Sequence, residues 1–118
     1  MSLERGSIAE QQARDYLIAQ GLVWIKSNFR CSMGEIDLIM RDSSHLVFVE
    51  VRQRSSHQYG GAIASITYGK RQKLLKSASL YLMINQGHDS IATRFDVLCL
   101  EGSRPTITWI KDAFGVDY

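Results

Sequence analysis

The chain has 118 residues, of which 45% are hydrophobic and 22% are charged, and it contains a single proline. This length and composition are typical of one globular domain with its own core, and they exclude a disordered or low-complexity protein. Because the formal net charge is only +2, a nucleic-acid partner has to be argued from local clusters of charge.

Two further features exclude other classes of protein. The amino-terminal segment carries no apolar signal region, and no run approaches the ~20 apolar residues of a membrane span. We therefore expect a cytoplasmic protein without membrane association. Cys31 and Cys99 match neither a paired metal-binding spacing nor a disulfide framework.

The first half of the chain predicts a helix followed by three strands. Apolar residues recur at helical spacing from about Ile8 to Gln20, and Gly21 is placed to end this helix. A first strand is expected over 22–26. Two runs with period-two alternation, about 34–41 and 45–53, predict the strands of a hairpin joined by a polar turn.

The second half predicts a loop, a helix, two strands and a short helical turn. In order, these elements cover 55–64, 68–86, 94–100, 106–110 and 112–114. Thr67 can cap the helix and Gly87 can stop it. Asp96 is expected to be a buried partner of a basic group. The order α-β-β-β-α-β-β predicts an α/β domain with a mixed central sheet flanked by helices, in which one right-handed crossover links the third and fourth strands.

The register of the hairpin determines where two acidic side chains lie. If the hairpin closes through Ser43-Ser44, or through a four-residue loop from Asp42 to His45, Asp37 lies opposite Glu50. A three-residue loop would put them on opposite faces. Facing residues have Cβ atoms roughly 4.5–5.5 Å apart, and two carboxylates at that distance repel each other. A divalent cation is the obvious group to compensate that repulsion.

The same register predicts the other pairs of the hairpin. Glu35 is expected to pair with Arg52. The opposite face is expected to be aliphatic, and its residues are Ile36, Leu38, Met40, Val47, Val49 and Val51. The alternative is an amphipathic hairpin whose charged side chains simply face water, since surface ion pairs contribute only ~0–1 kcal/mol and occur widely. The pattern alone leaves both interpretations open.

Two sequence blocks carry a resemblance to known proteins. They are Gly-Glu-Ile-Asp-Leu-Ile at 34–39 and Phe-Val-Glu-Val at 48–51, accompanied by Glu10, Asn28 and Arg94-Phe95-Asp96. With the element order, they resemble the core of the PD-(D/E)XK nucleases, whose fold Holliday junction resolvases and many restriction enzymes share. Over nearly the whole chain the sequence also resembles the YraN-type family of bacterial proteins. The resemblance implies one restriction-endonuclease-like domain over 1–118.

The resemblance also implies a metal site. Asp37 and Glu50 fall on the acidic positions of the nuclease motif and would hold Mg²⁺ or Mn²⁺, with the backbone carbonyl of Val51 as a further ligand. Glu10 resembles the glutamate that junction resolvases direct at the same centre from their amino-terminal helix. It shares a helical face with apolar residues and is expected to point towards the sheet. A boundary glutamate on a solvated helix is the alternative.

The chain departs from the nuclease motif at its lysine. Arg52 stands there, and an arginine stays protonated, so it cannot act as a base, although it can orient water or stabilise charge on the phosphoryl group. Lys70, at the start of the second helix, is the expected substitute. It could equally be one member of a basic helix face.

The second helix begins with a group of cations. Cations in the first turn oppose the helix dipole, so they are not explained by helix stability. A phosphate backbone would meet these side chains and the helix N–H groups together. The expected nucleic-acid-binding residues are Arg52, Arg54, Lys70, Arg71, Lys73 and Lys76. A solvated charged face is the alternative.

These features together favour a Mg²⁺- or Mn²⁺-dependent endonuclease that hydrolyses DNA phosphodiesters, on branched or otherwise non-B structures. Its catalytic residues would be Asp37, Glu50, Arg52 and Lys70. One alternative is a nucleic-acid-binding module whose catalysis is weakened by Arg52, and another is an interaction subunit that uses the scaffold only for shape. A resolvase-like role would favour a two-fold homodimer.

Overall fold

The computed structural model describes residues 2–54, 66–85 and 91–115, with side chains from residue 8 onward. The elements within these ranges are α1 (Ser2–Ala19), β1 (Val23–Cys31), β2 (Gly34–Asp42), β3 (His45–Arg54), α3 (Tyr68–Ile84), β4 (Ala92–Glu101) and β5 (Thr106–Phe114). This is the predicted order of helices and strands. The predicted loop 55–64 and the predicted helix end at Gln86 and Gly87 lie outside the described residues.

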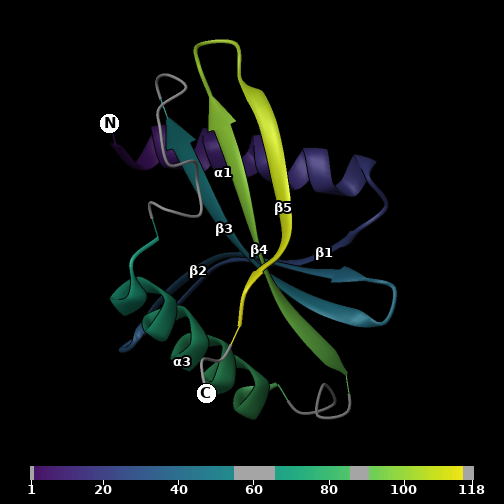
Figure 1. Ribbon diagram of the computed structural model, residues 1–118, viewed down its shortest axis with the longest axis vertical. Coiled ribbons are helices and arrows are strands. Elements are labelled where there is room, and N and C mark those ends of the chain that lie inside the picture. The colour runs from purple at the N-terminus through teal and green to yellow at the C-terminus, as the bar shows by residue number, and fades with distance from the viewer. Residues whose placement is uncertain (1, 55–65, 86–90, 116–118) are drawn as a thin grey trace.

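The five strands form one mixed sheet in the order β1-β2-β3-β4-β5 (Figure 1). β3 and β4 run parallel, and the other neighbouring pairs are antiparallel. Antiparallel neighbours can be joined by tight turns, whereas a parallel pair needs a crossover connection, which here contains α3. The prediction of a mixed sheet flanked by helices is confirmed.

The two helices cover opposite faces of the sheet. Val47 and Val49 pack in a cluster with Ala13 and Leu17 of α1, while Phe48 between them packs against α3. Since successive residues of a strand point to opposite faces, α1 and α3 lie on the two sides of β3. Figure 1 shows α1 behind the strands and α3 at the lower left. A strand buried on both sides reads as an unbroken hydrophobic run, as β3 does.

The first strand is longer than predicted. The prediction ended it at Lys26. In the structure β1 continues to Cys31 and stays paired with β2. Its register shifts between Trp24 and Lys26, and Asn28 has a φ of 55°. Asn is among the residues that tolerate this left-handed conformation, so β1 bends without ending.

The prediction of a helical turn at 112–114 is wrong, because β5 continues through Phe114. Its register with β4 shifts between Phe95 and Val97, and Asp112 has a φ of 53°. Beyond this bulge Phe114 stacks on Phe95, with 5.1 Å between the ring centroids. The apolar ring contact keeps the tail on the sheet.

The helix boundaries were predicted less closely than the helices themselves. α1 begins at Ser2, six positions before the predicted start. Thr67 caps α3 as predicted, because its Oγ1 accepts a hydrogen bond of 3.1 Å from Lys70 N. α3 ends at Ile84, where Asn85 N donates to Tyr81 O. Neither described helix has the length and hydropathy needed to cross a membrane.

Asp96 of β4 is fully buried and is surrounded by donors. Its Oδ1 accepts from Arg94 Nε at 3.0 Å and from Asp112 N at 2.9 Å. Its Oδ2 accepts from Trp109 Nε1 at 2.9 Å. Arg94 also pairs with Asp42 at 2.7 Å, so the network ties β4 to β5 and to the end of β2. Asp96 is the buried partner of a basic group that the sequence predicted.

We predict that Asp96→Ala lowers the free energy of unfolding by about 3–5 kcal/mol. The change leaves Trp109 Nε1 and Asp112 N without their acceptor and removes one of the two carboxylates that pair with the largely buried Arg94. Urea denaturation would measure this loss. Asp15→Ala, which removes an exposed carboxylate, should change stability by no more than about 0.5 kcal/mol. A loss below about 1 kcal/mol for Asp96→Ala would contradict this role for the network.

Candidate metal centre and basic surface

The hairpin of β2 and β3 opens at Asp37. The ladder between the strands runs from the pair Asp42–His45 to the pair Leu38–Val49, in the predicted register. Beyond it the Asp37 side chain contacts the backbone of β3, because its Oδ2 accepts a hydrogen bond of 2.8 Å from Val51 N. Asp37 therefore lies where the strands separate and not in a cross-strand pair.

The opening also changes which face the residues of β2 occupy. Leu38 and Met40 pack with α1, but Ile36 packs with the α3 cluster. The predicted continuous aliphatic face is therefore wrong at Ile36, because the side-chain alternation is interrupted between Ile36 and Leu38. The consequence is that Glu35 and Asp37 lie on the α1 side of the sheet.

Three carboxylates meet on that side. Glu10 of α1, Glu35 and Asp37 each offer an oxygen, and these oxygens lie within 4.8 Å of one another. Asn28 of β1 joins two of them. With its amide nitrogen towards the carboxylates, it donates to Glu10 Oε2 at 2.6 Å and to Glu35 Oε1 at 2.9 Å. The bent conformation of β1 at Asn28 thus aims an amide into the acidic group.

Glu50 lies beside Asp37 and is only 4% exposed. Its Oε2 is 3.4 Å from Arg52 Nη1 and 3.4 Å from Lys70 Nζ. Its Oε1 is also buried but has no hydrogen-bond partner among the described residues. We call Glu10, Glu35, Asp37 and Glu50 the carboxylate cluster. Unless a proton or a cation lies beside it, a charged oxygen desolvated in this way is costly.

Crowding raises the pKa of two members. Burial is the largest cause for Asp37 and the negative charge of Glu50 the next, and together they raise the pKa of Asp37 to about 8 despite the hydrogen bond from Val51 N. Burial, followed by the charge of Glu35, also raises the pKa of Glu10 above its ordinary value. In the metal-free protein these effects favour the protonated form of Asp37, whose proton can be donated to Glu50.

The predicted Glu35–Arg52 pair is wrong. Glu35 pairs across β1 with Arg30, whose Nε is 3.5 Å from Glu35 Oε1. Arg52 turns to Glu50 instead. The β2–β3 ladder ends before it reaches Glu35 and Arg52. Glu35 is therefore paired across the sheet with Arg30 of β1 and not with a residue of β3.

The residues of the cluster suit a hard divalent cation. Carboxylate oxygens are the preferred protein ligands of Mg²⁺ and Mn²⁺, and Glu50 Oε1, which no group in the described part of the chain meets with a hydrogen bond, can accept a cation. The backbone N–H of Val51 orients Asp37 by donating a hydrogen bond to it. The carbonyl of Val51 as a ligand stays a prediction.

Sequence reasoning missed two residues of this site. Glu35 was assigned to an ion pair with Arg52, although it stands two positions before Asp37 and shares its face. Asn28 was named only among the residues that carry the family resemblance, with no role in the site. The signal that could have found Asn28 is an asparagine within an otherwise strand-like run, a residue type that tolerates positive φ.

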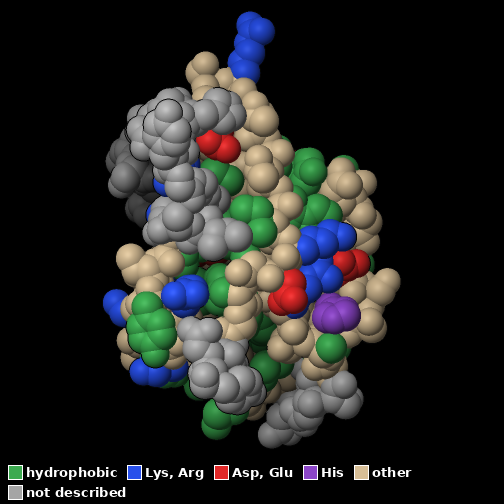
Figure 2. All heavy atoms as spheres, in the orientation of Figure 1, with side chains coloured by type: hydrophobic (Ala, Val, Ile, Leu, Met, Phe, Trp, Pro, Cys, Tyr) green, Lys and Arg blue, Asp and Glu red, His purple; other side chains and the backbone are tan. Residues whose placement is uncertain are grey.

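The cations of α3 begin next to the cluster and continue along the helix. We call Arg52, Arg54, Lys70, Arg71, Lys73 and Lys76 the basic surface. Lys73 and Lys76 are exposed, and Figure 2 shows lysine and arginine side chains over the start of α3, at the left of the view. Arg54 Nη1 and Arg71 Nε are shielded from solvent without a hydrogen-bond partner among the described residues. They are donors suited to an anion.

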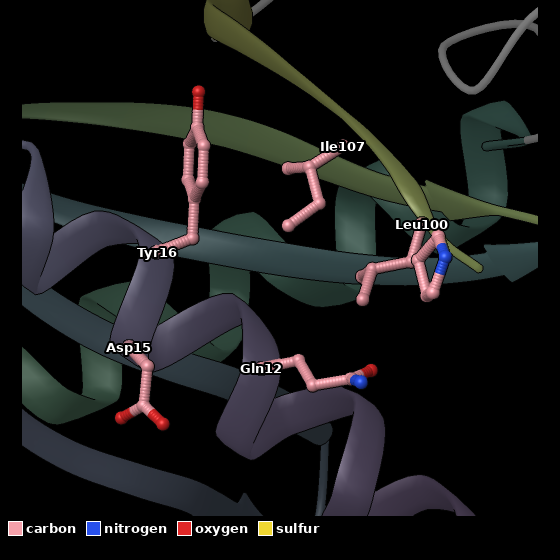
Figure 3. Close-up of a pocket in the computed structure, with 6 residues that line it drawn as sticks. Gln12, Asp15, Tyr16, Leu100 and Ile107 are labelled. Carbon is pink, nitrogen blue, oxygen red and sulfur yellow. The ribbon is translucent and has the colours of Figure 1, made fainter.

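A cavity of about 440 Å³ lies away from the carboxylate cluster, between α1 and the β4–β5 hairpin. Leu100, Pro105 and Ile107 form its apolar wall. Figure 3 shows the Asp15 carboxylate directed away from that wall. Because no set of polar groups converges in this cavity, the candidate site is the carboxylate cluster.

Comparison with known proteins gives the family. The family model described as "Uncharacterised protein family UPF0102" matches residues 9–100. The UPF0102 protein lpg2994 of Legionella pneumophila is 49% identical over 97% of both chains. The UPF0102 protein of Methylobacillus flagellatus is 50% identical over 92% of this chain and 95% of its own. These matches bear out the resemblance to the YraN-type family and carry no statement of activity.

We predict that the metal-free protein loses stability as the pH rises from about 5 to about 8. The pKa of Asp37 is raised on folding, so the folded state binds the extra proton and its stability falls as that proton is lost. Asp37→Asn should remove most of this dependence and raise the melting temperature at pH 8, by roughly 4 °C for each kcal/mol gained.

Thermal melts across that pH range would measure the effect, with Asp15→Asn as the matched control, because its carboxylate is exposed. If Asp37→Asn keeps the wild-type pH dependence, burial does not hold a proton on Asp37.

Proposed function

The chain belongs to the uncharacterised protein family UPF0102, and we propose that it is a divalent-metal-dependent endonuclease that hydrolyses nucleic-acid phosphodiesters, with DNA as its substrate. The observation that carries the proposal is the buried Glu50 Oε1, which has no hydrogen-bond partner among the described residues. Asp37 lies beside it, and Arg52 and Lys70 meet the other oxygen of the same carboxylate. Replacing a whole buried ion pair by apolar groups is often neutral or stabilising, so stability alone does not explain why these charges are present.

In this proposal Glu10, Glu35, Asp37 and Glu50 supply the ligands for Mg²⁺ or Mn²⁺. The bound ion would supply positive charge to the phosphoryl oxygens and make the attacking water more acidic. Val51 N and Asn28 hold Asp37, Glu10 and Glu35 in position through hydrogen bonds. The cluster is thus oriented before a ligand arrives, which is what electrostatic catalysis requires.

Lys70 is the proposed partner of the reacting phosphate. Its ammonium already lies 3.4 Å from Glu50 Oε2, although it comes from α3 and not from the motif position on β3. A lysine can share a proton with an attacking water, whereas Arg52 stays protonated and can only orient groups or stabilise charge. We therefore assign the acid–base role to Lys70 and the charge-stabilising role to Arg52.

The basic surface would hold the nucleic-acid backbone. Lys73 and Lys76 continue along α3 from Lys70, so a phosphate at the cluster places its neighbours along this helix. Such contacts determine position and affinity more than sequence preference. The alternative function is a non-catalytic nucleic-acid-binding module, which the arginine at position 52 favours.

We predict that wild-type protein cleaves DNA with Mg²⁺ or Mn²⁺, and that Asp37→Asn and Glu50→Gln abolish cleavage. Lys70→Met should lower the rate by ~10²-fold, in the range of general acid–base contributions. Arg52→Lys should gain little if Lys70 has the acid–base role. Single-turnover cleavage of linear, single-stranded and four-way-branched oligonucleotides would measure these rates.

Lys111→Met is the matched control, since it removes the same charge from β5. If neither metal supports cleavage of any of the three substrates while the wild type still binds them, the binding-module alternative replaces the enzyme.

We also predict that Lys73→Ala combined with Lys76→Ala weakens binding to unrelated duplexes about equally. The slope of log K against log salt should fall by about 1.8 in magnitude, because each lost phosphate contact removes ~0.9. Titrations at several salt concentrations would measure it. An unchanged slope in the double variant would remove this part of α3 from the interface.

A further inference from the structure

A small pocket adjoins the carboxylate cluster on the side away from α3. It lies between α1 and β1 and has a volume of about 160 Å³. Its lining residues are Glu10, Gln11, Arg14, Trp24, Ser27 and Asn28. Glu10 is a member of the carboxylate cluster, and Asn28 donates a hydrogen bond to it. Whatever occupies this pocket therefore lies next to the proposed metal ligands.

Trp24 forms the flat wall of the pocket. It is 43% exposed, so this large aromatic ring is not part of either core cluster that the helices form. The ring is nevertheless held in place. Its Nε1 donates to Ser27 Oγ at 3.0 Å, and the Arg14 guanidinium carbon lies 5.1 Å from the ring centroid. Because the guanidinium lies over one face of the indole, a ligand can stack on the outer face of the guanidinium or on the opposite face of the indole.

We propose that this pocket holds one unpaired nucleobase of the substrate, stacked on Trp24 and Arg14, next to the phosphate that is cleaved. The inference rests on the proposed function and adds to it the kind of strand that is recognised. A base inside a duplex is stacked between its neighbours and cannot enter a side pocket, so the substrate must have an unpaired or extruded base at the cleavage site.

The lining favours a nucleobase over an apolar side chain of a protein partner. A base has a π-face for the indole and polar edges for Gln11, Ser27 and Asn28. An apolar side chain would offer no partner to the Gln11 amide or to the remaining hydrogen-bonding capacity of Ser27 and Asn28, at a cost in free energy. Stacking tolerates any base, so the pocket would select for strand structure and not for sequence.

The test compares two fluorescently labelled probes of one sequence, a single strand and the fully paired duplex, with Ca²⁺ in place of Mg²⁺. Trp24→Ala should weaken binding of the single strand about tenfold, which is typical of one lost stacking contact. Duplex binding should not change, and Trp24→Phe should keep most of the affinity for the single strand. Val23→Ala is the matched control, because it shortens an exposed apolar neighbour on β1.

Three results would overturn the inference. Equal loss on both probes would make Trp24 a general contact. No loss on either probe, with normal cleavage, would leave the proposed function standing without this pocket. Dissociation of a dimer by Trp24→Ala, seen by sedimentation, would assign the surface to a second copy. If the wild type binds neither probe and cleaves nothing, the proposed function fails first.

Discussion

The hydrogen bond from Val51 N to Asp37 Oδ2 is the contact on which the candidate site depends. It takes the place of backbone pairing at the point where the β2–β3 ladder ends, and it reverses the side-chain alternation of β2 between Ile36 and Leu38. Glu35 and Asp37 thereby lie towards α1, where Glu10 is, while the neighbouring Glu50 meets cations from β3 and α3. In a regular ladder Glu35, Asp37 and Glu50 would share the α3 face with Ile39 and Phe48, and Glu10 of α1 would lie on the other side of the sheet.

Asp96 and Glu50 are both buried acids of the sheet, but their charges are compensated differently. Asp96 accepts hydrogen bonds from Arg94, Trp109 and Asp112 with both of its oxygens, so its charge is compensated within the protein. In the described part of the chain, cationic side chains meet only one oxygen of Glu50. Satisfied buried networks stabilise and specify a fold, whereas an unsatisfied buried oxygen raises the free energy of the protein until a ligand binds. The contrast separates a structural acid from a candidate ligand.

The bends in β1 connect the core to the proposed chemistry. A straight β1 would complete the edge of the sheet and present alternate residues to the two helices. The register shift after Trp24 and the positive φ of Asn28 instead place an indole and an amide at the rim of the carboxylate cluster. The same strand then returns to regular pairing up to Cys31, so the bends do not weaken the sheet beyond them.

The sequence by itself determined the element order, the hairpin register near its turn and the cap at Thr67. It also predicted Asp37, Glu50 and Lys70 as candidate site residues. Alternation, turn residues and capping are local, and the resemblance to a family supplied the acidic positions. Only the tertiary structure decided the partners of Glu35 and Arg52, the role of Asn28 and the pocket beside Trp24. These depend on where a ladder ends and where a strand bends, and such points follow from contacts between residues distant in the chain, which periodicity does not encode.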